Sequence, residues 1–127
     1  FYGTPKGPVM KYLEEGSDVI LEIEMQGARQ VKEMYPEAVL IFVLPPSLEE
    51  LRNRLTTRGT ETQEQVDERL STSFEEIKQV KDYNYFIFNE NNKTTESAKI
   101  IEDIIVAEKN KASRYEKAII KKFEEEL

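Results

Sequence analysis

The stretch AVLIFVLPP, residues 38–46, is the clearest strand signal in the sequence. Its first seven residues are all apolar and rich in β-branched side chains, a pattern typical of a strand that is covered on both faces of a parallel sheet. Pro45 and Pro46 end the strand, because proline has no backbone N–H to donate to a neighbouring strand. The fold is therefore expected to contain a buried strand at residues 38–44.

Further strands and helices alternate on both sides of this stretch. Val19–Glu24 is apolar until its two acids and predicts a second strand, and Tyr85–Phe88 predicts a third. Start and stop signals predict helices at Pro8–Glu15, at Gly27–Tyr35, from Leu48 to about Thr57, from Thr62 to about Val80, and from Thr95 as far as Phe123. We therefore expect an α/β fold whose parallel sheet carries helices on both faces and is joined by right-handed crossovers.

Two local signals define the helices after Pro46. Ser47 is an expected N-cap with Glu50 three residues later, which predicts a capping box. Gly59 interrupts the helical pattern. The next helix is expected to bury one stripe of apolar residues spaced three or four apart, namely Val66, Leu70, Phe74, Ile77 and Val80.

Composition restricts the classes of function. A length of 127 residues, with 39% hydrophobic and 34% charged residues, fits one soluble globular domain. The longest strongly apolar run has nine residues, fewer than the roughly 20 of a membrane helix, and no signal-peptide pattern opens the chain. We therefore expect a cytoplasmic protein without a membrane partner. The net charge of −7 disfavours nucleic acid as a partner.

Cysteine and histidine are both absent. Disulfides, thiolate chemistry, zinc sites of the usual kind and an imidazole base are therefore excluded. Any chemistry must use carboxylates, arginine, lysine, tyrosine or hydroxyl groups, and four groups of such residues stand out.

The first group is the acid pair Glu22 and Glu24, which ends the strand predicted at Val19–Glu24. Ligands of open α/β sheets bind at the carboxyl ends of strands. A carboxylate there can accept N–H bonds from a base or hold water around Mg²⁺. The alternative is a strand end at which the acids only reach solvent.

The second group is a set of arginines, Arg52, Arg54, Arg58 and Arg69, on the two helices after Pro46. Arg54 and Arg58 are four residues apart and share one helix face. The break at Gly59 is predicted to be the hinge of a mobile lid whose arginines close over transferring phosphates. The alternative is a set of surface ion pairs with the many glutamates nearby.

The last two groups are short. Tyr2-Gly3-Thr4 offers two hydroxyls around a glycine, and Asn89-Glu90 follows the third strand with an amide that suits the edge of a purine. Each is a weak signal alone, and a turn explains Asn89 equally well.

In combination and in order, these motifs resemble the guanylate kinase family. The series is Tyr2-Gly3-Thr4, LEIEMQG at 21–27, PPSLEEL at 45–51, Arg54, RGTE at 58–61 and Asn89-Glu90. The similarity extends from Phe1 to about Glu108, and the tail beyond looks like the extra C-terminal helix of some bacterial members. The resemblance implies a P-loop-kinase-like sheet with a helical lid. It also implies a reversible Mg²⁺-dependent phosphoryl transfer from ATP to GMP, giving ADP and GDP.

On the GMP side, the resemblance implies roles for four residues. Tyr2 would donate its hydroxyl to the GMP phosphate, and Thr4 would bond the guanine edge. Glu22 would lie at the monophosphate cleft with Glu24 beside it. The preference for guanine over adenine rests on this resemblance.

On the ATP side, Arg54, Arg58 and Arg69 match the phosphate-facing arginines of the family's lid and would be the catalytic residues. Asn89 falls where the family contacts the adenine of ATP, although Glu90 stands in place of the more usual aspartate. No residue of the chain is expected to be a direct metal ligand.

The family's Gly-rich P-loop, G-x-x-x-x-G-K-[ST], has no counterpart here, because none of the five glycines is followed by Lys and Ser or Thr. We therefore expect residues 1–127 to be one partial kinase domain whose N-terminal portion lies upstream of Phe1. Its lid and flanking helices would occupy about residues 48–83, and a C-terminal helical extension about 108–127. The parent protein is expected to be a nucleoside monophosphate kinase, and these residues alone to be inactive.

Two other readings remain. A non-catalytic guanylate-kinase-like module would bind phosphopeptides, and a scaffold would use the fold for assembly. Uncovered strand faces would also favour self-association of the fragment. The tail Glu108–Leu127 is expected to be a solvated helix, with partner binding as the alternative. Four apolar residues of the tail are expected to pack somewhere: Tyr115, Ile119, Ile120 and Phe123.

Overall fold

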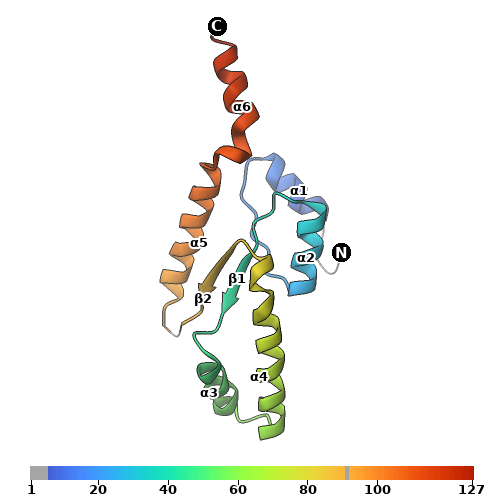
Figure 1. The fold of residues 1–127 in the computed structure, drawn as a ribbon, viewed down its shortest axis with the longest axis vertical. Coiled ribbons are helices and arrows are strands. Elements are labelled where there is room, and N and C mark those ends of the chain that lie inside the picture. The colour runs from blue at the N-terminus through green and yellow to red at the C-terminus, as the bar shows by residue number, and fades with distance from the viewer. Residues whose placement is uncertain (1–5, 91) are drawn as a thin grey trace. The chain divides into compact units, whose positions relative to one another are not determined.

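A computed structural model describes residues 6–90 and 92–127, shown in Figure 1. It divides into two compact units, one ending at Leu40 and one running from Ile41 to Leu127. Tyr2 and Thr4 lie outside the described residues. The elements in order are α1 (Lys6–Glu14), α2 (Met25–Met34), β1 (Ile41–Leu44), α3 (Leu48–Arg58), α4 (Gln63–Ile77), the 3₁₀-helix η1 (Lys78–Asp82), β2 (Tyr85–Phe88), α5 (Thr94–Lys109) and α6 (Ala112–Glu124).

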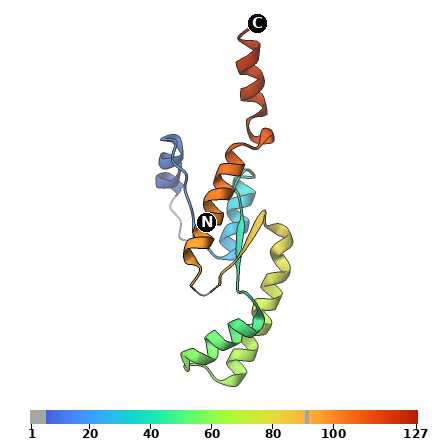
Figure 2. The same ribbon diagram turned by 90° about the vertical axis from the view of Figure 1, so that its left-hand side faces the viewer.

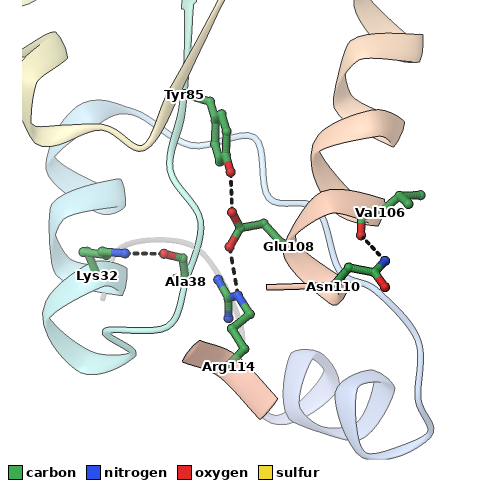
Figure 3. A network of polar contacts seen from close by, with 7 residues as sticks. All are labelled: Lys32, Ala38, Tyr85, Val106, Glu108, Asn110 and Arg114. Carbon is green, nitrogen blue, oxygen red and sulfur yellow. Dashed lines mark hydrogen bonds and ion pairs between the residues drawn. The ribbon is translucent and has the colours of Figure 1, made fainter. Parts of the chain in front are cut away.

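In the first unit, both predicted helices form. α1 ends at a glycine, Gly16, whose φ of +87° is in the left-handed region. The Gly16 N–H donates to the Leu13 carbonyl and the Ser17 N–H to the Tyr12 carbonyl. This pair of bonds is a Schellman cap, for which glycine is the favoured residue. At the other end of the unit, Lys32 of α2 donates to the Ala38 carbonyl (Figure 3).

The strand predicted at Val19–Glu24 is wrong. These residues form no strand, since the sheet of the described residues contains β1 and β2 alone. Burial still alternates along the segment, with Leu21 and Ile23 half-buried and Glu22 and Glu24 exposed. The period-two pattern is therefore present, but a strand also needs a neighbour that satisfies its backbone N–H and C=O groups.

The apolar side of this segment borders a cavity of about 200 Å³ in the first unit. Its lining is apolar and comes from α1, α2 and the segment between them, including Met10, Leu21 and Val31. Among residues 7–40 only Ala28 is buried. The first unit therefore has an open apolar interior.

In the second unit, β1 and β2 pair in parallel, in the register Ile41↔Tyr85 to Leu44↔Phe88. This confirms a parallel sheet and the strand predicted at Tyr85–Phe88. β1 is shorter than predicted, because the pairing with β2 begins only at Ile41. Tyr85 and Ile87 share one face of β2 and Phe86 and Phe88 share the other, since strand side chains alternate.

The two faces of β2 differ in burial. Ile87 is buried, and Tyr85 beside it reaches α5, as described below. Phe86 and Phe88 are about half exposed, and their rings contact each other edge to face at 5.4 Å. The sheet is therefore covered on the α5 face and open over these phenylalanines.

α3 and α4 pack against each other and lie side by side in Figures 1 and 2. Leu55, Val66 and Leu70 are buried between them, with Leu51 packed against this cluster. We call these two helices the lid pair, after the role that the sequence predicts for them. At its tip Gly59 has a φ of +68° and caps α3, and Thr62 and Gln65 form a reciprocal capping box on α4. The tip is thus fixed by local hydrogen bonds.

Three details of the predicted helices are wrong. At the start of α3 the Glu50 N–H donates to Ser47, but the carboxylate of Glu50 pairs with Arg54 and does not complete a capping box. On α4, Ser73 is buried, whereas Phe74 and Val80 of the predicted stripe are exposed. Helix α4 gives way to η1 after Ile77, which rotates later side chains off the stripe.

The final helix is also two helices and not one. α5 ends at Lys109, where the side-chain amide of Asn110 donates to the Val106 carbonyl at 2.9 Å (Figure 3). α6 then starts at Ala112. Within residues 6–90 and 92–127, no helix combines the length and the apolar character that crossing a membrane requires.

Candidate functional site

The carboxyl ends of β1 and β2 lie at the same edge of the sheet, because the two strands are parallel. The Asn89 N–H donates to the Leu44 carbonyl at 2.6 Å, which extends the pairing by one step past β2. The chain leaves β1 through Pro45 and β2 through Asn89. This edge is where open α/β sheets bind ligands.

Arg54 connects the lid pair to this edge. Its Nη2 donates to the Asn89 carbonyl at 3.0 Å, and its Nε lies 3.4 Å from a Glu50 carboxylate oxygen. Arg54 therefore has a fixed position at the base of the lid pair.

The other arginines can be placed by helical geometry, since successive residues of an α-helix are rotated by about 100°. On α3, Arg52 lies on one side of the buried Leu55, and Arg54 and Arg58 lie on the other. On α4, Asp67 lies on one side of the buried Val66 and Arg69 on the other.

An ion pair decides which of these sides coincide. Arg52 on α3 and Asp67 on α4 are 2.9 Å apart, so their two sides face the same way. The opposite sides then also coincide, which places Arg69 on the same side of the lid pair as Arg54 and Arg58. Three arginines from two helices therefore lie on one side of the lid pair, and guanidinium groups are frequent protein partners of phosphate.

The three arginines differ in their partners. Arg58 and Arg69 are exposed and form no ion pair with any residue in 6–90 or 92–127. The alternative reading of surface ion pairs therefore holds for Arg52, which pairs with Asp67, and for Arg54, which pairs with Glu50, but not for these two. Unpaired guanidinium groups remain available to an anion.

The ion pair between Arg52 and Asp67, which we call the strut, links α3 to α4 on the side of the lid pair opposite Arg54, Arg58 and Arg69. Gln63 also donates to Asp67, at 3.1 Å. Exchanging the two charges, Arg52→Asp with Asp67→Arg, is expected to retain the thermal midpoint, whereas Asp67→Ala alone should cost about 0.2–1 kcal/mol. Thermal unfolding followed by circular dichroism measures both. A double exchange less stable than the single variant would contradict the strut.

The hinge predicted at Gly59 is wrong in its position. Gly59 is the tip of the lid pair, and the helices on its two sides are packed together through Leu55, Val66 and Leu70. Bending at the tip would break this packing. The connections to the sheet are at the other end, after Leu44 and before Tyr85.

Glu22 and Glu24 belong to the first unit. Both are exposed, and Glu24 is the N-cap residue of α2, with an extended backbone and no side-chain cap bond. Its carboxylate lies at the positive end of the helix dipole. Helix α2 starts at Met25, two residues before the predicted start at Gly27.

A further polar group was not predicted from the sequence. The Tyr85 hydroxyl donates to the buried carboxylate of Glu108, and Arg114 Nε donates to the same carboxylate at 2.8 Å (Figure 3). The hydrogen bond from Tyr85 and then that from Arg114 lower the pKa of Glu108, while its partner Glu108 raises the pKa of Tyr85. We call this group the Glu108 clasp. It joins β2, α5 and the start of α6.

The Glu108 clasp is expected to make the free energy of unfolding depend on pH in the acidic range. A carboxylate with a lowered pKa stabilises the folded state above its ordinary pKa of 4.5, and this contribution is lost as the pH falls through the folded value. Glu108→Gln should therefore lower the urea midpoint at pH 7 and have little effect near pH 3. An equal loss at both pH values would contradict the assignment.

Within residues 6–90 and 92–127, no three Asp or Glu side chains lie close enough together to form a metal-binding site. The second unit therefore carries the arginines, whose guanidinium groups suit phosphate. The exposed carboxylates of Glu22 and Glu24 belong to the first unit.

Comparison with known proteins agrees with this chemistry. The model of the guanylate kinase family matches residues 1–108. The chain belongs to the guanylate kinase family. Of its relatives, "Guanylate kinase" of Clostridioides difficile (strain 630) is 65% identical over 127 residues, covering 100% of this chain and 61% of that protein. "Guanylate kinase" of Caldanaerobacter subterraneus subsp. tengcongensis is 47% identical and that of Oceanobacillus iheyensis 46% identical, with the same coverage.

The chain thus spans about 61% of the length of these guanylate kinases. The part that matches the family model includes the lid pair, β2 and the sheet edge at Asn89. The family model ends at Glu108, so helix α6 lies beyond it.

Proposed function

We propose that this chain forms the lid and part of the nucleotide-binding surface of a guanylate kinase. The reaction is the Mg²⁺-dependent transfer of a phosphoryl group from ATP to GMP, giving ADP and GDP in purine metabolism. The observation that carries the proposal is the shared side of the lid pair on which Arg54, Arg58 and Arg69 lie. A cytoplasmic location, and partners limited to GMP and ATP without nucleic acid or membrane, belong to the same proposal.

The arginines would act by charge. Phosphoryl transfer spreads negative charge over the oxygens of the transferring group, and its catalysis is mostly positioning and electrostatic stabilisation. Arg58 and Arg69 are exposed without an ion pair among the described residues, and Arg54 is held at the base by Asn89. In the proposal Arg58 and Arg69 meet the phosphates, and closure of the lid pair excludes water.

The nucleotide sites follow from the family resemblance of particular residues. Asn89, at the sheet edge, would contact the adenine of ATP. Tyr2 would donate to the GMP phosphate and Thr4 to the guanine edge, while Glu22 would line the monophosphate cleft beside Glu24. The exposure of Glu22 and Glu24 supports a role in binding, because both carboxylates are accessible to a ligand.

The donor set fits a Mg²⁺ ion that is held mainly by the nucleotide. Mg²⁺ usually keeps several waters and takes one or two carboxylates together with substrate phosphates. The exposed carboxylates of Glu22 and Glu24 could accept hydrogen bonds from such waters. When bound, the ion offsets phosphate charge.

The test uses a chimera in which this chain replaces the matching 61% of the Clostridioides difficile guanylate kinase. We expect the chimera to release ADP from ATP in the presence of GMP and Mg²⁺, in a coupled assay. The 127-residue chain alone should be inactive, because none of its glycines begins a G-K-[ST] motif.

The outcomes separate the candidates. Turnover by the chain alone would overturn the proposal of a partial domain. A folded chimera without turnover would contradict the kinase. Saturable binding of a phosphopeptide by a chimera that does not bind GMP would favour the non-catalytic module.

A further inference from the structure

Glu50 stands at a capping-box position of α3 but directs its carboxylate elsewhere. Its N–H donates to Ser47 at 3.0 Å, while its carboxylate oxygen lies 3.4 Å from Nε of Arg54, one turn later on the same helix. An acid four positions before a base is the favourable order for an ion pair on a helix. The carboxylate of Glu50 therefore serves Arg54 and not the N-cap.

The ion pair between Glu50 and Arg54 is more covered than the strut. The side chains of Glu50 and Arg54 are 31% and 29% exposed, against 45% and 56% for Arg52 and Asp67. The Nε atom of Arg54 is shielded from solvent. A charged group that loses its hydration needs an opposite charge beside it, and Glu50 supplies one. Removing the charge of Glu50 is therefore expected to change the position of Arg54.

Arg54 in turn holds the main chain at Asn89. Nη2 of Arg54 donates to the Asn89 carbonyl at 3.0 Å, and the Asn89 N–H donates to the Leu44 carbonyl at 2.6 Å. Both main-chain polar groups of Asn89 are thus bound, one to α3 and one to the end of β1. Asn89 is exposed, and neither bond uses its side-chain amide. An amide that extends from a fixed backbone loses less freedom when it binds a ligand.

We propose that Glu50 is a positioning residue of the ATP site. Its carboxylate holds Arg54 against the Asn89 carbonyl, and Arg54 fixes the sheet edge from which the Asn89 amide contacts the base of ATP. This inference rests on the proposed function, because it takes ATP as the ligand of that edge. Glu50 itself does not touch the nucleotide and acts through Arg54, as residues that orient a binding group commonly do.

Steady-state kinetics of the chimera with the Clostridioides difficile guanylate kinase tests the proposal. Glu50→Gln keeps the size of the side chain and removes its charge. We expect the KM for ATP to rise about 10-fold, as for the loss of one charge-assisted hydrogen bond. The KM for GMP and kcat at saturating ATP should change little. A side chain that only stabilised the fold would instead lower the active fraction, and therefore kcat, and leave both KM values unchanged.

Glu49→Gln is the matched control. Glu49 is the other acid in the first turn of α3, so the same charge is removed from the same end of the helix dipole. Glu49 is exposed and lies three residues before Arg52, toward the strut. We expect this variant to keep both KM values. Equal increases of the KM for ATP in the two variants, or an unchanged KM for ATP in Glu50→Gln, would overturn the proposal.

Hydrogen exchange in the 127-residue chain tests the same positioning without turnover. Glu50→Gln is expected to speed exchange of the Asn89 N–H about 10-fold, measured by NMR, because that N–H is protected only while it donates to Leu44. Glu49→Gln should leave the rate unchanged. A folded chimera without turnover would contradict the proposed kinase function, whereas an unchanged exchange rate in Glu50→Gln would overturn the role of Glu50.

Discussion

Replacing Arg69 with alanine in the chimera with the Clostridioides difficile guanylate kinase is expected to lower kcat by about 100-fold or more. A guanidinium that meets charge developing on the transferring phosphoryl group stabilises the transition state more than the bound substrates. Arg69 is exposed, lies on the side of Arg54 and Arg58, and forms no ion pair in residues 6–90 or 92–127. Its loss should therefore affect kcat much more than the KM for GMP.

The matched control for this prediction is Arg52→Ala. It removes the same group from the same pair of helices, but from the side that carries Asp67. Steady-state kinetics of both variants should show a fall of at most a few-fold for Arg52→Ala. Equal losses would mean that the variants act through the fold of the lid pair, and unchanged turnover in Arg69→Ala would remove Arg69 from the site.

Replacing Leu55 with alanine is expected to destabilise the lid pair by about 2–5 kcal/mol, the usual range for a buried leucine. Leu55 is 6% exposed and contacts the cluster that contains Val66 and Leu70. This cluster is the whole buried apolar contact between α3 and α4 among the described residues. A cavity there leaves little else to hold the two helices together.

Leu48→Ala is the control, because Leu48 is on the same helix but 37% exposed. Limited proteolysis at the Arg58–Gly59 bond, together with helix content from circular dichroism, measures the effect. We expect rapid cleavage in Leu55→Ala and slow cleavage in Leu48→Ala. Equal cleavage rates would show that the packing of Leu55 does not hold the tip.

Much of the fold follows from local signals in the sequence. The end of α1 at Gly16, the end of α3 at Gly59 and the strand Tyr85–Phe88 are all set by neighbouring residues, and each is confirmed. Helix α1 starts at Lys6, two residues before the predicted Pro8. The strand predicted at Val19–Glu24 does not form, because a strand needs a neighbouring strand as well as the right sequence pattern. The break between α5 and α6 was missed because both helices continue the same apolar periodicity across Asn110.

The candidate site was predictable in composition but not in geometry. The spacing of four positions from Arg54 to Arg58 indicates one helix face. The alignment of Arg69 with them could be inferred only from the ion pair between Arg52 and Asp67, which joins residues 15 apart. The position of Gly59 suggested a hinge because the sequence does not reveal packing across a turn. The Glu108 clasp joins residues 23 apart and has no local pattern at all.

The parallel pairing of β1 and β2 has a consequence for how the chain folds. Leu44 and Tyr85 are separated by residues 45–84, so the strands can meet only after a long loop closes, and loop closure of this kind slows folding. The lid pair occupies most of that loop and forms through contacts close in sequence. Its helices therefore shorten the distance that the unfolded chain must search, and the lid pair brings the two strands together as it forms.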